Sequence, residues 1–221
     1  MSNKDGFELF QANVLKLEEI ATGVFVLSYK KIHEFIAGQV IAISTNLNDK
    51  PRLYSIASGV REEEVRILFN VVPEGKLTTQ MSQLIEGDKI FISKPFGKFT
   101  GTKDPAYWIA AGTGIAPFAS MFYSGLASNK ILIHGGRTLS AFYFRNVFEA
   151  YFEDDYIPCC SQQSGTGVFN GRLTEYLKAL NELPPKHKYY LCGSAEMVVE
   201  TRDILIQKGI PFKQIIAEIY F

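Results

Sequence analysis

The feature that most constrains the fold is an alternation of apolar runs and helical stretches in the second half of the chain. The apolar runs have the length of buried strands and lie at 107–111, 130–134, 156–160, 188–192 and 215–220. Helical stretches separate them, near 117–126, 140–151, 173–180 and 195–208. Strands and helices in alternation need crossover connections, so this half is predicted to form a parallel sheet with helices on both faces. Ligands of such α/β sheets bind at the carboxyl ends of the strands.

The first half has a different pattern of apolar residues. Short segments rich in Val, Ile and Phe, separated by Gly, Pro and Asn-Asp clusters, lie at 24–29, 39–44, 65–71 and 89–93. This spacing is typical of an antiparallel β-barrel or sandwich. The turn-rich stretch 94–103 separates the two patterns, and we place the domain boundary at Gly101. The expected domains are therefore residues 1–101 and 102–221.

Composition excludes several classes of protein. The 221 residues carry a formal net charge of zero, which gives no support for binding to nucleic acid or to a membrane surface. The three cysteines show no paired spacing, which favours a reducing compartment over a disulfide framework. An iron-sulfur cluster is usually held by about four thiolates, so this chain cannot bind one by cysteine alone. The three histidines lie far apart, so no metal site is expected. No apolar run approaches the roughly 20 residues of a membrane span, and we expect a cytoplasmic protein.

The stretch Arg52-Leu53-Tyr54-Ser55 offers what a flat, anionic ligand needs. Arg52 can hold a phosphate with two parallel hydrogen bonds, Tyr54 can stack on a ring, and Ser55 can donate or accept a hydrogen bond. An ordinary edge strand with polar side chains is the alternative for so short a segment.

A glycine-rich turn follows the first apolar run of the second half. Gly112, Thr113 and Gly114 precede a helical pattern that begins near Pro117. Glycines at such a turn let the backbone approach a pyrophosphate, which the helix N-terminus favours. The spacing differs from G-x-G-x-x-G, because Pro117 stands in the place of the third glycine.

A second anion site is predicted within the β-rich half. Gly75 precedes a short helical pattern that begins with Lys76, Leu77 and Thr78 and continues to Leu84. Backbone N–H groups and the hydroxyls of Thr78 and Thr79 could bind a phosphate there. A capped surface helix without a ligand is the alternative.

Two further stretches complete a pattern: the strand end at Cys192-Gly193 and the chain end Glu218-Ile219-Tyr220-Phe221. Together with the stretch at Arg52–Ser55 and the glycine turn at Gly112–Pro117, in this order and at these separations, they make four motifs that resemble those of the ferredoxin-NADP reductase family of flavoproteins, and more closely its bacterial branch. The resemblance covers nearly the whole chain. It implies an FAD-binding β-barrel, an NAD(P)-binding α/β domain, and hydride transfer between the two cofactors.

The resemblance also implies residue roles. Tyr54 would stack on the flavin and Ser55 would hydrogen-bond near the nitrogen that takes the hydride, while Cys192 would lie beside the nicotinamide. Glu218 would exchange protons in the flavin region. Tyr220 would cover the opposite flavin face, with Phe221 extending the tail where tryptophan is familiar. Ser55, Cys192, Glu218 and Tyr220 are thus the expected catalytic residues.

Choice of coenzyme is where the sequence departs from the family pattern. Members selective for NADPH carry an arginine soon after a serine on the third strand of this domain, but here Gln162 follows Ser161. Arg137 and Arg172 still stand in positions that can supply positive charge. The sequence slightly favours NADPH and leaves NADH open.

The expected redox partner is ferredoxin or flavodoxin, which are acidic, and a basic rim at Lys94, Lys98 and Lys103 could receive them. Two alternatives stay open. The chain could be a flavin reductase that uses flavin as a substrate, or an electron-transfer subunit that is active only within a larger complex.

Overall fold

The computed structural model of the chain describes residues 7–220. Contacts between residues group the chain into two compact units. The first comprises the residues up to Gly101 together with Ala119–Gly125, and the second comprises Thr102–Phe118 together with Leu126 onward. Each unit is described by itself.

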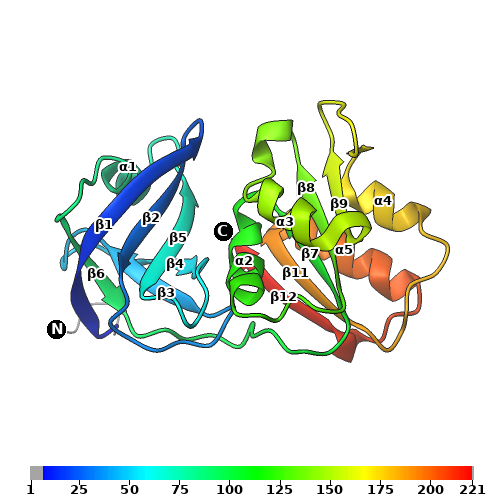
Figure 1. Cartoon of the computed structure of the whole chain (residues 1–221), viewed down its shortest axis with the longest axis horizontal. Helices are drawn as coiled ribbons and strands as arrows, with labels where there is room; N and C mark the ends of the chain where they lie inside the picture. The colour runs from blue at the N-terminus through cyan, green and yellow to red at the C-terminus, as the bar shows by residue number, and fades with distance from the viewer. Residues whose placement is uncertain (1–6, 221) are drawn as a thin grey trace. The chain divides into compact units, whose positions relative to one another are not determined.

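The first unit contains an antiparallel sheet of six strands in the order β4-β3-β6-β1-β2-β5 (Figure 1). Its strands are β1 (Leu9–Ala21), β2 (Val24–Lys30), β3 (Val40–Ser44), β4 (Arg52–Ser55), β5 (Glu64–Asn70) and β6 (Lys89–Ser93). The two edges of the sheet meet where Ile56 pairs with Ile67 and the N–H of Ala57 donates to the carbonyl of Arg66 at 2.8 Å. The predicted antiparallel barrel is therefore confirmed.

One strand of this barrel was not among the segments predicted from the sequence. β1 is 13 residues long and serves two neighbours: Leu9–Asn13 pair with β6, and Val14–Ala21 pair with β2. A register shift between Val14 and Lys16 marks the change of partner. Because outward-facing charged residues interrupt its apolar residues, β1 lacks the compact apolar run of the other strands.

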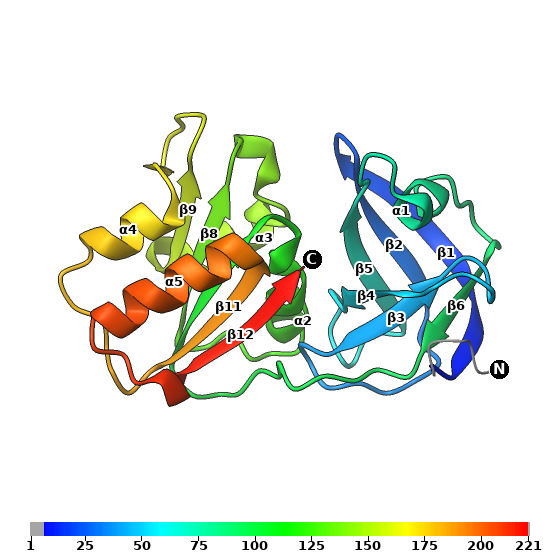
Figure 2. The same ribbon diagram turned by 180° about the vertical axis from the view of Figure 1, so that it is seen from behind.

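The second unit contains a parallel sheet of six strands in the order β10-β9-β8-β7-β11-β12. Its strands are β7 (Ala106–Ala111), β8 (Lys130–Gly136), β9 (Tyr156–Cys160), β10 (Phe169–Asn170), β11 (Lys188–Ser194) and β12 (Ile215–Tyr220). Its helices are α3 (Arg145–Phe152), α4 (Leu173–Ala179) and α5 (Ala195–Gln207), and α2 (Ala116–Tyr123) begins in it, while the residues of α2 from Ala119 onward group with the first unit. Helix α3 covers one face of this sheet, and α4 and α5 cover the other (Figures 1 and 2), which confirms the predicted α/β architecture.

The central strands form because their side chains are almost continuously apolar, as expected when both faces of a parallel sheet are covered. In β7 every residue from Ala106 to Ala110 is buried. Trp108 is completely buried and contacts the rings of Phe118 and Phe152. This packing fixes the end of β7 from which the glycine turn leaves.

Two elements differ from the sequence prediction. The stretch 140–151 is divided into a 3-10 turn at Leu139–Ala141 and helix α3, because Phe144 between them has φ of 62°. The two-residue strand β10 was not foreseen, since so short a segment has no apolar periodicity. Between residues 7 and 220, no helix combines the length and the apolar character needed to cross a membrane.

Candidate functional site

The glycine turn links β7 to α2 at the carboxyl edge of the parallel sheet. Gly112–Ile115 form a 3-10 turn that continues into α2, with Pro117 as the second residue of that helix. Gly112 has φ of +56°, and a Cβ built on it would meet nothing within 4 Å. A Cβ on Gly114 would lie 2.4 Å from the carbonyl oxygen of Cys192. One glycine thus leaves the backbone open to a ligand, and the other lets the turn press against the end of β11.

Three of the four predicted catalytic residues meet beside this turn. Cys192 of β11 pairs with Glu218 of β12, and Ser194 pairs with Tyr220. Burial raises the pKa of the Cys192 thiol well above its usual value; the charge of Glu218 also raises it, whereas a hydrogen bond with Tyr220 lowers it. Cys192 is therefore a neutral thiol in contact range of both groups, as expected for a packing residue rather than a nucleophile.

Gly193 follows Cys192, and a Cβ there would lie 2.5 Å from Cε of Met197, so the end of that flexible side chain would have to move. The hydroxyl of Ser194 accepts a hydrogen bond from the N–H of Met197 and so caps α5. Phe221 lies outside the described residues. The fourth predicted catalytic residue, Ser55, belongs to the first unit.

The residues predicted to choose the coenzyme lie along the same carboxyl edge. The N–H groups of Ser161 and Gln162 donate to the carbonyls of Gly136 and Arg137 at 3.1 and 3.0 Å. The N–H of Gly171 donates to the carbonyl of Cys160 at 2.8 Å, which places Arg172 next to the end of β9. The ends of β8, β9 and β10 thus carry Arg137, Ser161 and Arg172 side by side in the sheet order.

Two carboxylates that the sequence analysis did not single out join this edge. Glu196, in the first turn of α5, accepts a hydrogen bond of 2.9 Å from Arg172, and Glu200 lies 3.8 Å from the same guanidinium. The only signal in the sequence was their spacing of four residues on one helix face, which is common on solvated surfaces.

His134, in strand β8 shortly before Arg137, is completely buried. Its Nδ1 lies 3.0 Å from the hydroxyl of Tyr156, and no hydrogen-bond partner of its Nε2 is found among the described residues. Burial, together with the charge of Arg145, lowers the pKa of His134 to about 3. This imidazole is neutral and belongs to the core beneath the site.

In the first unit, β4 is an edge strand that presents the predicted flavin residues. Arg52 is exposed and its guanidinium has no ion pair or hydrogen bond within residues 7–220, and Leu53 is 55% exposed. The Tyr54 ring packs edge-to-face on Phe69 at 6.3 Å, and burial raises its pKa to about 12. Ser55 is only 2% exposed. A free guanidinium and an apolar surface therefore lie on one open edge.

The turn before α1 (Lys76–Met81) differs from the expectation in one respect. The hydroxyl of Thr78 accepts a hydrogen bond from the N–H of Val72 at 3.0 Å, and that of Thr79 donates to the carbonyl of Gly75 at 2.9 Å. Both hydroxyls thus serve the turn itself, because the Gly75 carbonyl and the Val72 N–H need partners. The N–H groups of Lys76 and Leu77, at the free N-terminus of the helix, are what this turn can offer to an anion.

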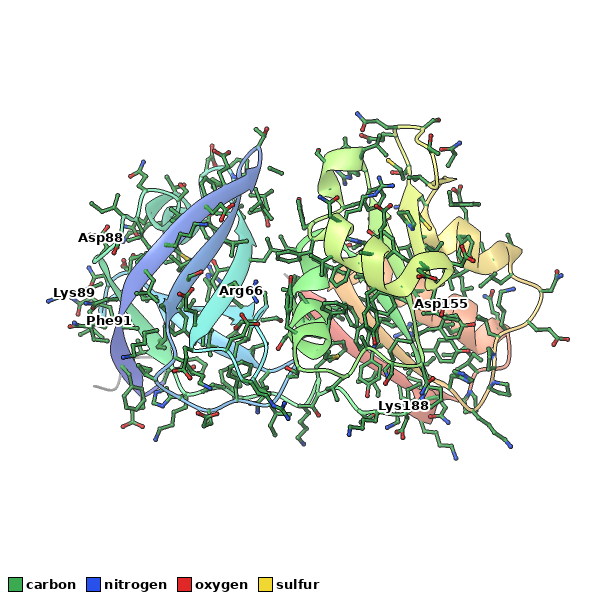
Figure 3. All side chains as sticks on the ribbon, viewed as in Figure 1. Arg66, Asp88, Lys89, Phe91, Asp155 and Lys188 are labelled. Carbon is green, nitrogen blue, oxygen red and sulfur yellow. The ribbon has the colours of Figure 1, made fainter. Side chains whose placement is uncertain are left out.

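A shallow cavity of about 290 Å³ lies at the opposite edge of the parallel sheet, where its strands begin. It is lined by Lys130, Asp155 and His187 among others, and by none of the predicted site residues. Figure 3 shows nearby Lys188 at the start of β11, where it pairs with Asp104 at 2.8 Å. Over the described part of the chain, no group of three or more His, Cys, Asp or Glu residues could hold a metal ion.

Comparison with known proteins assigns both halves of the chain. Residues 14–100 match the family described as "Oxidoreductase FAD-binding domain", and residues 108–203 match the "Oxidoreductase NAD-binding domain". The chain is 29% identical over 208 residues to a ferredoxin--NADP reductase of Pseudomonas aeruginosa, covering 80% of each. It is 30% identical over 220 residues to the phenol hydroxylase P5 protein of Acinetobacter pittii, covering 90% of this chain and 62% of that protein.

The fold is shared with a solved structure of a ferredoxin NADP+ reductase from Neisseria gonorrhoeae, with a TM-score of 0.87 at 20% identity. That likeness covers 96% of this chain and 99% of the other. With two matched oxidoreductase domains in this order, a barrel followed by a parallel sheet, the chain belongs to the ferredoxin-NADP reductase family of flavoproteins.

Proposed function

We propose that residues 1–101 hold FAD, that residues 102–221 hold NAD(P)H, and that the protein moves electrons between the nicotinamide and a one-electron carrier, ferredoxin or flavodoxin. The observation that carries this proposal is the meeting of Cys192, Glu218 and Tyr220 beside the glycine turn. The chemistry supplied by bound FAD is the acceptance of a hydride and the release of its electrons singly.

The residues of the first unit fit a flavin dinucleotide. The guanidinium of Arg52 is exposed and has no competing partner among the described residues, so it can bind a phosphate bidentately. Leu53 and the half-buried ring of Tyr54 supply apolar surface for a planar ring. The free N–H groups of Lys76 and Leu77 supply two further donors to phosphate oxygens.

The residues of the second unit fit a pyridine nucleotide. The open space at Gly112 lets a pyrophosphate reach the backbone, and Thr113 and Gly114 continue that turn. Cys192 supplies a small neutral side chain against which a nicotinamide can pack. The carboxyl of Glu218 holds or passes a proton, and the ring of Tyr220 covers the position that a nicotinamide would take.

The first test is an anaerobic titration of the purified protein with NADPH and NADH while the visible flavin absorption is followed. We expect bound flavin to bleach with at least one nucleotide. A colourless protein that cannot be reconstituted with FAD would remove the proposal. Glu218→Gln should slow electron transfer to carriers without loss of flavin, and unchanged rates with every acceptor would remove its role.

Arg52 can be tested against a matched control in the same unit. Arg61 is also exposed and unpaired within residues 7–220. Arg52→Met should weaken FAD retention, because it removes a charge-assisted pair with a phosphate, whereas Arg61→Met should not. Equal flavin release from the two variants during gel filtration would contradict the assignment.

The aromatic tail gives a separate test. Deleting Tyr220 and Phe221 should increase occupancy by nicotinamide, because the ring that competes for its place is gone. An unchanged affinity for the nucleotide would count against this role for Tyr220.

We further propose that the protein works in the cytoplasm and that the acidic carrier binds to a basic rim. Of the three lysines expected to form a basic rim, Lys94 pairs with Glu8 at 3.3 Å, which leaves Lys98 and Lys103 as the freer charges. The chain spans only 62% of the phenol hydroxylase P5 protein and 64% of a toluate 1,2-dioxygenase electron transfer component. The alternative that this chain is an electron-transfer subunit, active only within a larger complex, is therefore tested as well. Full turnover by the isolated chain with an artificial acceptor would favour the autonomous reductase.

A further inference from the structure

The shallow cavity at the edge where the strands of the parallel sheet begin contains none of the residues assigned above to FAD or NAD(P)H. Its volume is about 290 Å³. An apolar part of its lining comes from Pro105, Ala106 and Ile131, and a polar part comes from Asn129, Lys130, Asp155 and His187. All seven residues belong to the second unit, so the cavity is a feature of that unit alone.

Lys130, the first residue of β8, brings an unpaired positive charge to this cavity. Only 2% of the residue is exposed although it stands at the margin of the sheet, and no carboxylate pairs with it within residues 7–220. Its ammonium donates one hydrogen bond, of 3.1 Å, to the carbonyl of Ser128 and lies 5.7 Å from the centre of the Trp108 ring. Lysine is rarely buried without a partner, and an ammonium has three N–H donors. Two donors therefore remain for a group inside the cavity.

Asp155 brings an unpaired negative charge to the same cavity. It is exposed, ends the short 3-10 turn after α3 (Figure 3), and has no ion pair within the described residues. Burial raises the pKa of Tyr107, and the charge of Asp155 adds to this effect, so the carboxylate lies on the side of the sheet that Tyr107 faces. Lys130 lies over Trp108, the next residue of the strand, which faces the other side. The two charges therefore approach the cavity from opposite faces of the sheet and do not pair with each other.

The other charges close to Lys130 neutralise one another. Lys188 pairs with Asp104 at 2.8 Å and lies 3.4 Å from the hydroxyl of Thr102. Burial lowers the pKa of Lys130, the charge of Lys188 adds to this effect, and the charge of Asp104 opposes it. The imidazole of His187 adds a hydrogen-bonding group to the lining. One ammonium and one carboxylate are thus left without partners on two sides of a single cavity.

This arrangement fits a ligand that carries one charge of each sign. A phosphate would place about two negative charges near the carboxylate of Asp155, and a simple amine would meet the ammonium of Lys130. The apolar residues of the lining leave a surface for a short hydrocarbon side chain. Since pockets for drug-sized ligands measure roughly 300–1,000 Å³, this cavity suits a molecule of only a few heavy atoms.

We propose that the cavity binds a small zwitterionic amino acid, whose carboxylate pairs with Lys130 and whose ammonium pairs with Asp155. The side chain of the amino acid would lie against Pro105, Ala106 and Ile131. This site is independent of the FAD and NAD(P)H sites, so its ligand should bind whether or not the protein is a reductase. Because the cavity is shallow and Asp155 is exposed, we expect a dissociation constant on the order of 1 mM.

The test compares three small probes on the full chain: L-alanine, propionate, which lacks the ammonium, and ethylamine, which lacks the carboxylate. Trp108 is the only tryptophan of the chain and lies beneath the ammonium of Lys130, so its fluorescence is followed at pH 7 and constant ionic strength, with calorimetry as a second measure. Propionate should bind about fivefold more weakly than L-alanine, because a pair with an exposed carboxylate contributes little. Ethylamine should bind roughly 10- to 100-fold more weakly, because it loses the charge-assisted hydrogen bond with the buried ammonium.

Two substitutions and a matched control locate the site. Lys130→Met removes the buried charge and should weaken L-alanine binding roughly 10- to 100-fold. Lys186→Met makes the same change of net charge at an exposed residue outside the lining and should leave the binding unchanged. Asp155→Asn should reduce the affinity for L-alanine to that for propionate without weakening propionate. Since Asp155 is exposed, this variant carries the test if Lys130→Met does not fold.

Three results would overturn the inference. The first is no saturable signal with L-alanine up to about 50 mM in either measurement. The second is binding of propionate or inorganic phosphate at least as tight as that of L-alanine, which would indicate a simple anion site. The third is an equal loss of L-alanine binding in the Lys130 and Lys186 variants, which would indicate a general effect of net charge.

Discussion

Substituting Gly112 by alanine tests whether the glycine turn is open because a pyrophosphate must reach it. Gly112 has φ of +56°, so alanine pays the left-handed penalty of roughly 1–2 kcal/mol. Its methyl group would meet no protein atom within 4 Å, so no clash adds to this cost. The methyl would instead occupy the open side of the turn and keep a phosphate oxygen from the backbone. Loss of one charge-assisted hydrogen bond of about 1.5–3 kcal/mol weakens binding by roughly 10- to 100-fold.

The matched control is Gly23→Ala. Gly23 lies in the turn between β1 and β2, has φ of +70°, and likewise has nothing within 4 Å of a Cβ. Both variants should therefore lower Tm by several degrees, at about 4–8 °C per kcal/mol for a unit of this size. Only Gly112→Ala should weaken the binding of ADP, measured by calorimetry. If the two variants bind ADP equally well, the reasoning about the turn is refuted.

Three further predictions concern the second unit. Trp108→Ala should lower the free energy of unfolding by about 3–5 kcal/mol in a urea titration, because the side chain is completely buried; Trp108→Phe should cost much less, since it keeps a ring and removes an indole N–H with no acceptor among the described residues. His134 has a folded-state pKa of about 3 against an unfolded value near 6.5, so its contribution to stability is present above pH 6.5 and is lost as pH falls toward 3; His134→Gln should flatten that decline, and identical slopes would contradict it. All three cysteines are buried, so a thiol reagent at pH 8 should react slowly with the native protein and rapidly after denaturation; fast native labelling of Cys192 would contradict its neutral, packed state.

The strands that the sequence predicted are those whose burial shows in their own residues. The segments 89–93, 156–160 and 215–220 coincide with β6, β9 and β12, because a compact apolar run between turn residues is a local signal. The carboxyl edge followed in turn from the alternation of strands and helices. The long strand β1 was not predicted, since its partners lie on two different strands and its outward face is charged.

The sequence predicted which residues lie together along the carboxyl edge of the sheet, but not which charged side chains pair with one another there. Glycine turns and the strand ends at Cys192 and Glu218 follow from short motifs. The pairing of Arg172 with Glu196 joins residues 24 apart in sequence, and nothing in the sequence around either residue indicates it. The hydroxyl of Thr78 likewise accepts a hydrogen bond from the N–H of Val72 and not from a ligand, because a backbone N–H in a tight turn needs a partner within the protein.

Strand β1 also sets the order in which the first unit can assemble. Its second half pairs with β2 across a short turn at Gly23, but its first half pairs with β6, so that Leu9 faces Ser93. The hairpin can form as soon as residue 30 is available, whereas closure of the sheet waits for nearly the whole unit. During synthesis, the amino-terminal part of β1 therefore stays an unpaired edge until β6 leaves the ribosome. That edge is where a nascent chain of this protein is most exposed to pairing with the wrong partner.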